Sequence, residues 1–351
     1  MSPLKVDQST LDHATRSGTN MEPVTRAVDG FVNRILVRKY IGQSMPLFVA
    51  CGLALFAFAW VRVWVVSLLD MGQFQTILEQ FRDFEKFAPI GFDALFTYPG
   101  RVGMTYDEPI VMLCTVIWCI ARGSDVISGE MGRGTLEMLL AQPIRRRTLV
   151  LSHATVSVVG LLLLCLLVWA GIGAGIMATS VEESVAPPSF RIPIFNIDVP
   201  LTVDQPETQT VPLRERVDPA MFAASTFHLF AFGFFLLGLA TLFSSLDRYR
   251  WRTVGAIVGV YVIQLVMFGL GKAAESLQWM LSLSFFSCYK PQKMTEIVAK
   301  EGLAGPWSLI KTAPDVALPP LVYPLILIGL GTVFYAVAIA HFQRRDLPAP
   351  L

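Results

Sequence analysis

The side chains best suited to chemistry are concentrated in one stretch of the sequence, residues 121–153. It reads ARGSDVISGEMGRGTLEMLLAQPIRRRTLVLSH and mixes acids, arginines and glycines. Asp125 and Glu130 lie five residues apart, with Arg122 and Arg133 beside them. Opposite charges this close together attract, so we expect them to form ion pairs. Such pairs can also pass a movement from one element to another, which is the functional interpretation of this stretch.

The side chains required for nucleophilic, metal or phosphate chemistry are scattered. The His residues are few and dispersed, so no Ser-His-Asp arrangement can be argued, and H-E-x-x-H is absent. His153 and His228 are each expected to make a helix–helix hydrogen bond. The five cysteines include no C-x-x-C pair, which favours free thiols over disulfides or zinc ligands. Gly271-Lys272 does not complete a phosphate-binding loop, because Ala273 follows it. We therefore predict no catalytic, cofactor or metal site on this chain.

The composition predicts that these side chains are positioned by membrane-spanning helices. The chain has 351 residues, of which 54% are hydrophobic and only 16% charged, and its mean hydropathy is +0.56. Soluble domains carry about 25% charged residues, so this chain lacks the polar side chains to cover a water-facing surface. The 28 Lys and Arg nearly balance the 27 Asp and Glu, which argues against a whole-chain basic field for nucleic acid. The predicted fold class is an all-α polytopic membrane protein.

Six apolar runs are long enough to cross a bilayer as helices. The predicted spans are residues 46–68, 109–127, 149–178, 220–244, 253–271 and 321–341. Residues 277–288 are apolar but only about half a span long, so we place them in a re-entrant or interfacial segment. Arg62 lies about 24 Å along the first span between Trp60 and Trp64, and it is expected to anchor the far end of that span at the interface. The predicted transmembrane domain covers residues 46–341.

Both ends of the chain are predicted to lie outside the spans. Residues 1–21 are polar and without periodicity, which is typical of a disordered tail, and residues 342–351 form a second short tail. Residues 22–45 place apolar side chains at helical spacing with basic residues such as Arg38 and Lys39 between them. This pattern predicts an amphipathic helix in the membrane interface, and the alternative is a plain cytosolic helix.

Charges sort by side when the N-terminus is placed in the cytosol. The inner segments are then residues 1–45, 122–148, 245–252 and 342–351, and the outer ones are residues 69–108, 179–219 and 272–320. The inner segments hold 16 basic and 9 acidic residues, whereas the longer outer segments hold 11 and 18. Cytosolic loops carry an excess of Lys and Arg, so both termini are predicted to be cytoplasmic. The outer segments form a small cap or lie at the interface.

The large inner loop contains a short amphipathic helix over about residues 128–142. Gly134 and nearby glycines permit a tight turn, and Thr135 is expected to cap the new helix. Pro143 suits a break before the third span. Three leucines at i, i+3 and i+4 spacing then form one apolar face: Leu136, Leu139 and Leu140. Such a helix, held between two spans, suits docking onto a cytosolic partner.

The segment SGEMGRGTLEMLLAQPIRRRTLVLSH resembles the signature of the ABC transporter type-2 permeases. That pattern has an acidic residue, then Gly-Thr-Leu-Glu, a Leu pair, a Pro and a following Arg. The matching residues are Glu130, Gly134, Thr135, Leu136, Glu137, Leu139, Leu140, Pro143 and Arg146. The resemblance implies that the loop supplies a coupling helix that contacts a nucleotide-binding subunit. An amphipathic helix before six spans agrees with this family over the rest of the chain.

The resemblance also implies a function and partners. The chain would be a permease subunit of an ABC transporter in the cell (inner or plasma) membrane, moving a substrate in the direction of export. ATP and Mg²⁺ would bind a separate cytosolic ATPase subunit, and a second permease copy would complete a homodimer or heterodimer. The alternative is a membrane-embedded scaffold or enzyme without ATPase coupling. Glycine pairs at positions 171 and 175, and at 255 and 259, have the G-x-x-x-G spacing that allows close helix approach.

Overall fold

The structure, a computed structural model, describes residues 32–68, 97–142, 144–184, 189–192, 197–200, 208–310 and 317–345. Within these residues, six helical segments are long and apolar enough to cross a membrane. They are α2 (Arg34–Ser67), the segment Tyr98–Gly132, α9 (Arg146–Ala178), the segment Pro219–Leu246, α11 (Arg250–Ala273) and α14 (Val322–Arg344). Every predicted span lies inside one of these six to within one residue at its ends, so the predicted fold class is confirmed.

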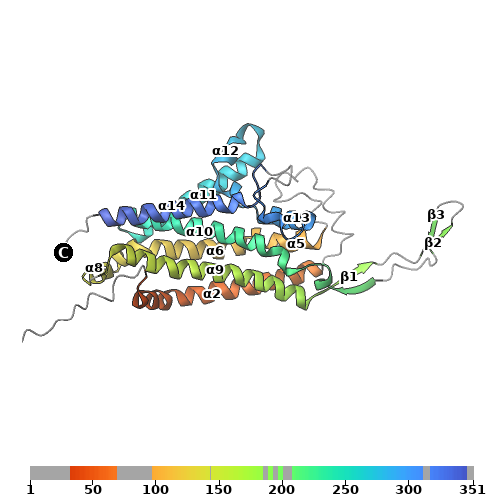
Figure 1. The fold of residues 1–351 in the computed structure, drawn as a ribbon, viewed down its shortest axis with the longest axis horizontal. Coiled ribbons are helices and arrows are strands. Elements are labelled where there is room, and N and C mark those ends of the chain that lie inside the picture. Colours follow the sequence, from red (N-terminus) through yellow and green to blue (C-terminus); the bar gives the residue numbers. More distant parts are fainter. Residues whose placement is uncertain are drawn as a thin grey trace, which may run out of the picture.

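Two of the six segments are built from several helices. Tyr98–Gly132 comprises α5 (Tyr98–Gly103), η3 (Met104–Asp107), α6 (Pro109–Ser124), the π-helical turn η4 (Asp125–Gly129) and α7 (Glu130–Gly132). Pro219–Leu246 comprises η6 (Pro219–Phe222) and α10 (Ala223–Leu246). The long helices run roughly along one direction, with α8 (Thr135–Leu140) at one end of the bundle and α5 and α13 (Pro291–Glu301) at the other (Figure 1). These two ends are called the α8 end and the α13 end below.

Helix α2 begins before the predicted first span. The side chain of Asn33 accepts hydrogen bonds from the backbone N–H groups of Ile35 and Leu36, which is a strong N-terminal cap. From there the helix continues without interruption through Pro46 to Ser67. Residues 1–31, which hold the predicted tail and the first part of the predicted interfacial helix, lie outside the described residues, as do residues 346–351. Of the segment predicted as an interfacial helix, Arg34 and the residues that follow form the first part of α2, and the interfacial position remains a prediction.

Helix α10 lies at the centre of the bundle, where it contacts α6, α9, α11, α13 and α14. It is the most buried of the six spans and α11 is the least buried. On the other side, α2 and α9 pack closely because of the first glycine pair. A Cβ atom on Gly171 would lie 2.6 Å from the carbonyl oxygen of Phe56, and one on Gly175 would lie 2.7 Å from Val63 Cβ. At Gly255 and Gly259, by contrast, no atom of the described residues lies within 4 Å of the added Cβ.

The α13 end carries short elements instead of further spans. Strand β1 (Ser180–Ser184) pairs antiparallel with β4 (Thr208–Pro212), and β2 (Ser189–Ile192) pairs with β3 (Ile197–Pro200). The remaining short helices are η5 (Leu213–Glu215), η7 (Glu275–Leu277), α12 (Trp279–Leu283), η8 (Phe285–Cys288) and η9 (Gly305–Trp307). The predicted half-span segment therefore folds as η7, α12 and η8. Phe286 in this segment is buried against Phe232 of α10, with ring centroids 5.6 Å apart.

Candidate functional site

The second span continues beyond α6 through the π-helical turn η4 (Asp125–Gly129). A π turn interrupts the normal helical hydrogen bonds, and such turns occur frequently at functional sites. Ser244 of α10 stabilises this one: its Oγ accepts from the backbone N–H groups of Ile127 (3.1 Å) and Ser128 (3.0 Å). The same hydroxyl donates to the carbonyl oxygen of Ser124 at 3.1 Å. The turn is thus fixed to the central helix of the bundle.

Glu130 is the first residue of α7, and its side chain is fully buried. Lys39 of α2 donates to both carboxylate oxygens, at 2.9 and 3.0 Å, and Arg133 Nη2 lies 3.2 Å from one of them. The hydroxyl of Thr135 donates to the same carboxylate. A buried carboxylate is costly unless it is paired and hydrogen-bonded, and here both conditions are met. Glu130 therefore connects α2 to the loop and to α8.

Asp125 forms the second centre of charge at the α8 end. Arg133 donates to its two oxygens at 2.8 and 3.3 Å, and Arg250, the first residue of α11, approaches to 3.2 Å. Arg122 Nη1, on α6, lies 4.0 Å from Asp125 Oδ2. The hydrogen bond to Asp125 raises the pKa of the Arg133 guanidinium above its ordinary value. The predicted ion pairing is confirmed. The six residues that form what we call the ionic cluster are Lys39, Arg122, Asp125, Glu130, Arg133 and Arg250.

The two histidines singled out in the sequence have different surroundings. Arg122 Nη2 lies 3.0 Å from His153 Nε2. A guanidinium only donates, so Nε2 must accept, which leaves the proton on Nδ1 facing Ser157 Oγ at 3.3 Å. The ring of His153 also packs edge-on against Tyr40. The helix–helix hydrogen bond predicted for His153 is confirmed. For His228 it is wrong, because neither ring nitrogen of this buried side chain has a partner in the described structure.

A left-handed residue separates α7 from α8. Gly134 has φ of 70°, a conformation that favours glycine because it has no Cβ, and it occupies the N-cap position of α8. The capping role predicted for Thr135 is wrong, since α8 has no side-chain cap. With Gly134 at the cap, Thr135 falls inside the first turn and its hydroxyl donates to Glu130, including the backbone oxygen at 3.2 Å.

The leucine face of α8 packs into its own chain. Leu136 is buried, and Leu139 and Leu140 are partly buried against a second hydrophobic cluster at this end. That cluster joins α2, η4, α8, α9 and α14 through Leu36, Tyr40, Val126, Ile127, Leu136, Leu149, Val150, Val156 and Phe342. The opposite side of the helix, which we call the open face of α8, consists of Glu137, Met138 and Ala141, all exposed. Met138 is 72% exposed.

Arg146 ties the other end of the loop to the end of α14. Its Nη1 donates to the carbonyl oxygens of Phe342 (3.1 Å) and Arg345 (2.6 Å), where a cation is favoured by the helix dipole. Arg345 in turn donates to the carbonyl oxygen of Ser245 at the end of α10, at 2.7 Å. Pro143, the other residue expected between α8 and α9, lies outside the described residues. The loop is thus anchored at both of its ends.

Three contributors to this site were not found by sequence reasoning: Lys39, Ser244 and Arg250. Each comes from a helix distant in the sequence, so no local spacing points to them. One signal was available, because both cations lie in predicted cytosolic segments. Among the described residues, no group of three or more His, Cys, Asp or Glu could hold a metal ion. The geometry thus presents one small helix, α8, at the end of the bundle. Side-chain contacts connect it and its loop to α2, α6, α10, α11 and α14.

Comparison with known proteins identifies the family to which this architecture belongs. A family model described as ABC-2 family transporter protein matches residues 44–347. No curated protein matches the chain. The family match covers most of the chain, from within α2 through the loop and its helix α8 to just beyond the end of α14. The chain therefore belongs to the ABC-2 transporter family and is a multi-pass permease component of an ABC transporter.

Proposed function

We propose that this chain is the permease subunit of an ABC exporter and that a separate cytosolic ATPase subunit docks on the open face of α8. The observation that carries the proposal is the way α8 is mounted. Its leucine face is held in the second hydrophobic cluster, its base is held by the ionic cluster, and Glu137 and Met138 remain exposed.

The ionic cluster supplies a path by which a movement of α8 reaches the spans. Thr135 in its first turn is bonded to Glu130, and Glu130 is bonded to Lys39 of α2. Through Arg133, the same cluster reaches Asp125 and the start of α11 at Arg250. Displacing α8 would therefore exert force on α2 and α11 together, as expected of a coupling element. ATP and Mg²⁺ would act on the partner, and this chain would contribute no cofactor.

The proposed orientation places the α8 end in the cytosol. The cluster has four cations against two carboxylates, and Arg146 and Arg345 lie at the same end. An excess of Lys and Arg marks the cytosolic side, so both termini are proposed to be cytoplasmic. A second permease copy would complete the transport path. Gly255 and Gly259 of α11 have open space beside them and so provide a surface for close helix contact.

The test uses two methionines of equal exposure at opposite ends of the bundle. Met138 on the open face of α8 is 72% exposed, and Met177 at the far end of α9 is 73% exposed. Met138→Glu should weaken ATPase binding about tenfold or more, because it places an unpaired charge in a desolvated contact. Met177→Glu should leave binding unchanged. The measurements are the amount of a phosphate-loop ATPase that copurifies in detergent and the ATP hydrolysed per permease.

The outcome separates the two functional hypotheses. If Met138→Glu retains both the copurifying ATPase and its hydrolysis, α8 is not the docking element. If no ATPase copurifies with the unaltered chain, the result favours the alternative of a scaffold or enzyme without ATPase coupling. Charged substitutions at Leu139 or Leu140 would be less informative, because these side chains are partly buried and their loss would disturb the fold as well as the contact.

A further inference from the structure

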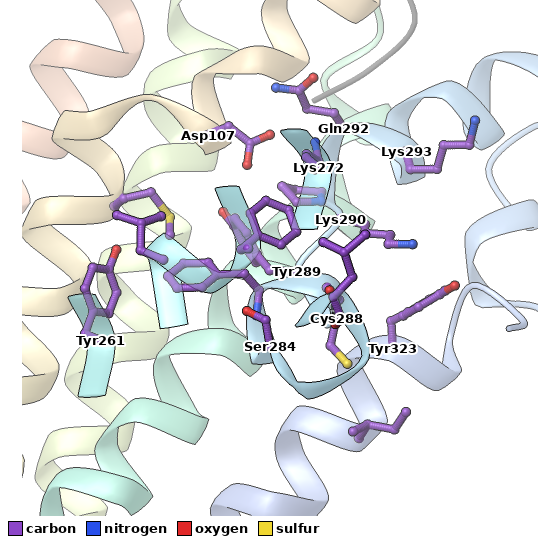
Figure 2. Close-up of a pocket in the computed structure, with 18 of the residues that line it drawn as sticks. Asp107, Tyr261, Lys272, Ser284, Cys288, Tyr289, Lys290, Gln292, Lys293 and Tyr323 are labelled. Carbon is purple, nitrogen blue, oxygen red and sulfur yellow. Dashed lines mark hydrogen bonds between the residues drawn. The ribbon is translucent and has the colours of Figure 1, made fainter. Parts of the chain in front are cut away.

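A pocket of about 1210 Å³ opens at the α13 end between α6, α11, α14 and the segment that leads from α12 into α13. Its labelled polar residues Asp107, Lys272 and Gln292 lie near one another towards the top of the view, and Tyr261 lies apart from them at the left (Figure 2). Ligand pockets commonly measure about 300–1,000 Å³, so this space is large enough for an extended molecule. The pocket lies well away from α8 and the ionic cluster.

The walls of the pocket are apolar and follow two helices. On α11 the lining residues recur at spacings of four, three and four: Tyr261, Leu265, Phe268 and Lys272. These residues share one helix face and extend over about 16 Å, roughly half the hydrocarbon thickness of a bilayer. On α6 the facing residues are Met112, Leu113 and Val116. Leu113 and Leu265 are 58% and 47% exposed, so the apolar wall of the pocket reaches the outer surface of both helices.

The mouth of the pocket carries lysines. Lys272 Nζ lies 5.1 Å from the Phe268 ring centroid, and Lys290 Nζ lies 4.6 Å from that of Tyr323. A third lysine, Lys293, is paired with Glu296 at 2.8 Å. The ammonium group of Lys290 has no carboxylate within 4.0 Å in the described part of the chain. The mouth therefore offers a cation that is held by an aromatic ring and open to an anion.

A buried amide at the mouth supplies a second, independent sign of a ligand. Gln292 is only 3% exposed, it lines the pocket, and neither its side-chain nitrogen nor its oxygen makes a hydrogen bond of normal geometry. It lies near Asp107 and Lys272 at the same end of the pocket (Figure 2). The Asp107 carboxyl is the polar neighbour of this amide. Because no hydrogen bond of normal geometry forms, a polar group that entered the mouth could gain one from Gln292.

We propose that this pocket binds an amphiphile with one anionic head group and a hydrocarbon chain. The head group lies at the mouth, where Lys290 neutralises it. The chain lies along Phe268, Leu265 and Tyr261 of α11. The amphiphile enters sideways from the lipid between Leu113 and Leu265. This binding site goes beyond the proposed transport function and needs no ATPase, so it is tested on the permease alone.

The first experiment identifies the ligand class. The purified full-length permease, in discs of phosphatidylcholine bilayer, is mixed with hexadecyl phosphate that carries a diazirine in its chain. Illumination should cross-link the chain to residues 261–268 or 112–116. Unlabelled hexadecyl phosphate should compete, whereas hexadecylphosphocholine, which has the same chain, and butyl phosphate, which has the same anionic group, should not. Cross-linking elsewhere, or equal competition by the phosphocholine, overturns the proposal.

The second experiment uses matched variants in the same assay. Lys290→Gln should weaken hexadecyl phosphate binding about fivefold, the effect of one interfacial cation on an anionic lipid. Lys300→Gln, on an exposed part of α13 outside the pocket, should not. Leu265→Trp should block the lateral opening and abolish cross-linking. Val266→Trp, exposed on the neighbouring position of α11, should not. Unchanged binding by both pocket variants, with normal melting temperatures, overturns the proposal.

Discussion

At the α8 end, each carboxylate of the ionic cluster lies close to at least two cations from different elements. At the α13 end, by contrast, Lys290 lies against the ring of Tyr323 and has no carboxylate within 4.0 Å in the described part of the chain. The polar backbone of the π turn is likewise paired with Ser244. Gln292 at the opposite end has the Asp107 carboxyl beside it, but its amide makes no hydrogen bond of normal geometry. The carboxylates and turn amides of the α8 end are thus paired, although Tyr40 Oη and Arg122 Nε are buried there without a hydrogen bond. At the α13 end it is a cation and an amide that lack close partners.

This difference fits two different tasks for the two ends. An element that transmits movement must be held firmly to what it moves, and paired buried charges from several helices provide that connection. A binding pocket must instead keep polar groups available and space unfilled until its ligand arrives. We therefore expect substitutions at the α8 end to act mainly on stability and coupling, and substitutions at the α13 end to act mainly on binding.

The largest expected effect on stability tests the paired charges of the α8 end. Glu130→Ala removes the buried carboxylate and leaves Lys39, Arg133 and the hydroxyl of Thr135 without their shared partner. Breaking a buried ion pair costs about 3 kcal/mol, and water reaching the partly exposed lysine and arginine will reduce this somewhat. Unfolding of the detergent-solubilised protein by heat or denaturant should therefore begin well below that of the unaltered protein.

Glu137→Ala is the matched control for this substitution. Glu137 lies seven residues further on and is exposed, so its loss should change the free energy of unfolding by no more than about 0.5 kcal/mol. Equal stability of the two variants would mean that the ionic cluster does not hold the α8 end together. The contrast between the two ends would then lose its main support.

An intermediate effect is expected where α10 holds the π turn. Ser244→Ala removes the acceptor for the buried N–H groups of Ile127 and Ser128, at a cost of about 1–2 kcal/mol. Hydrogen exchange at these amides should become faster. Thr332→Ala is the control, because the exposed Thr332 hydroxyl donates to the carbonyl of Ile328 in its own helix and holds no other helix within the described residues. Unchanged exchange in the Ser244 variant would show that the turn does not depend on α10.

The spans could be predicted from the sequence because their signal is local. About twenty consecutive apolar residues reveal a span wherever it lies in the bundle, and each predicted segment lies inside an observed one to within one residue at its ends. The pairing of Asp125 with Arg133 was predictable for the same reason, since the two residues are eight positions apart. Contacts that depend on helix packing left no such trace. Lys39 meets Glu130 across 91 positions, and Ser244 meets Ser128 across 116.

The orientation of α8 shows how a correct pattern can leave two readings open. The i, i+3, i+4 leucines do form one face, but periodicity alone does not say what that face contacts. In the structure the second hydrophobic cluster, built from residues of five elements, receives Leu136, and this leaves Met138 exposed. The outer pocket was also beyond prediction, because its walls come from α6 and α11 and its mouth from the half-span segment and the start of α13.

The smallest expected effect comes from an ion pair towards the α13 end. Arg62 Nε donates to Glu108 Oε1 at 2.9 Å, joining α2 to the start of α6, and both side chains are partly exposed. Pairs of this kind contribute about 0.5 kcal/mol and are screened by salt. Arg62→Gln should therefore lower the melting temperature only slightly, and the difference should shrink as NaCl is raised from 50 mM to 1 M, roughly 13 Å to 3 Å in screening length. The deficit of Glu130→Ala, whose carboxylate is buried, should persist at high salt. If Arg62→Gln lowered the melting temperature as much as Glu130→Ala, and salt did not change this, both ends would be held by desolvated charges. The contrast between the paired charges of the α8 end and the available polar groups of the α13 end would then fail.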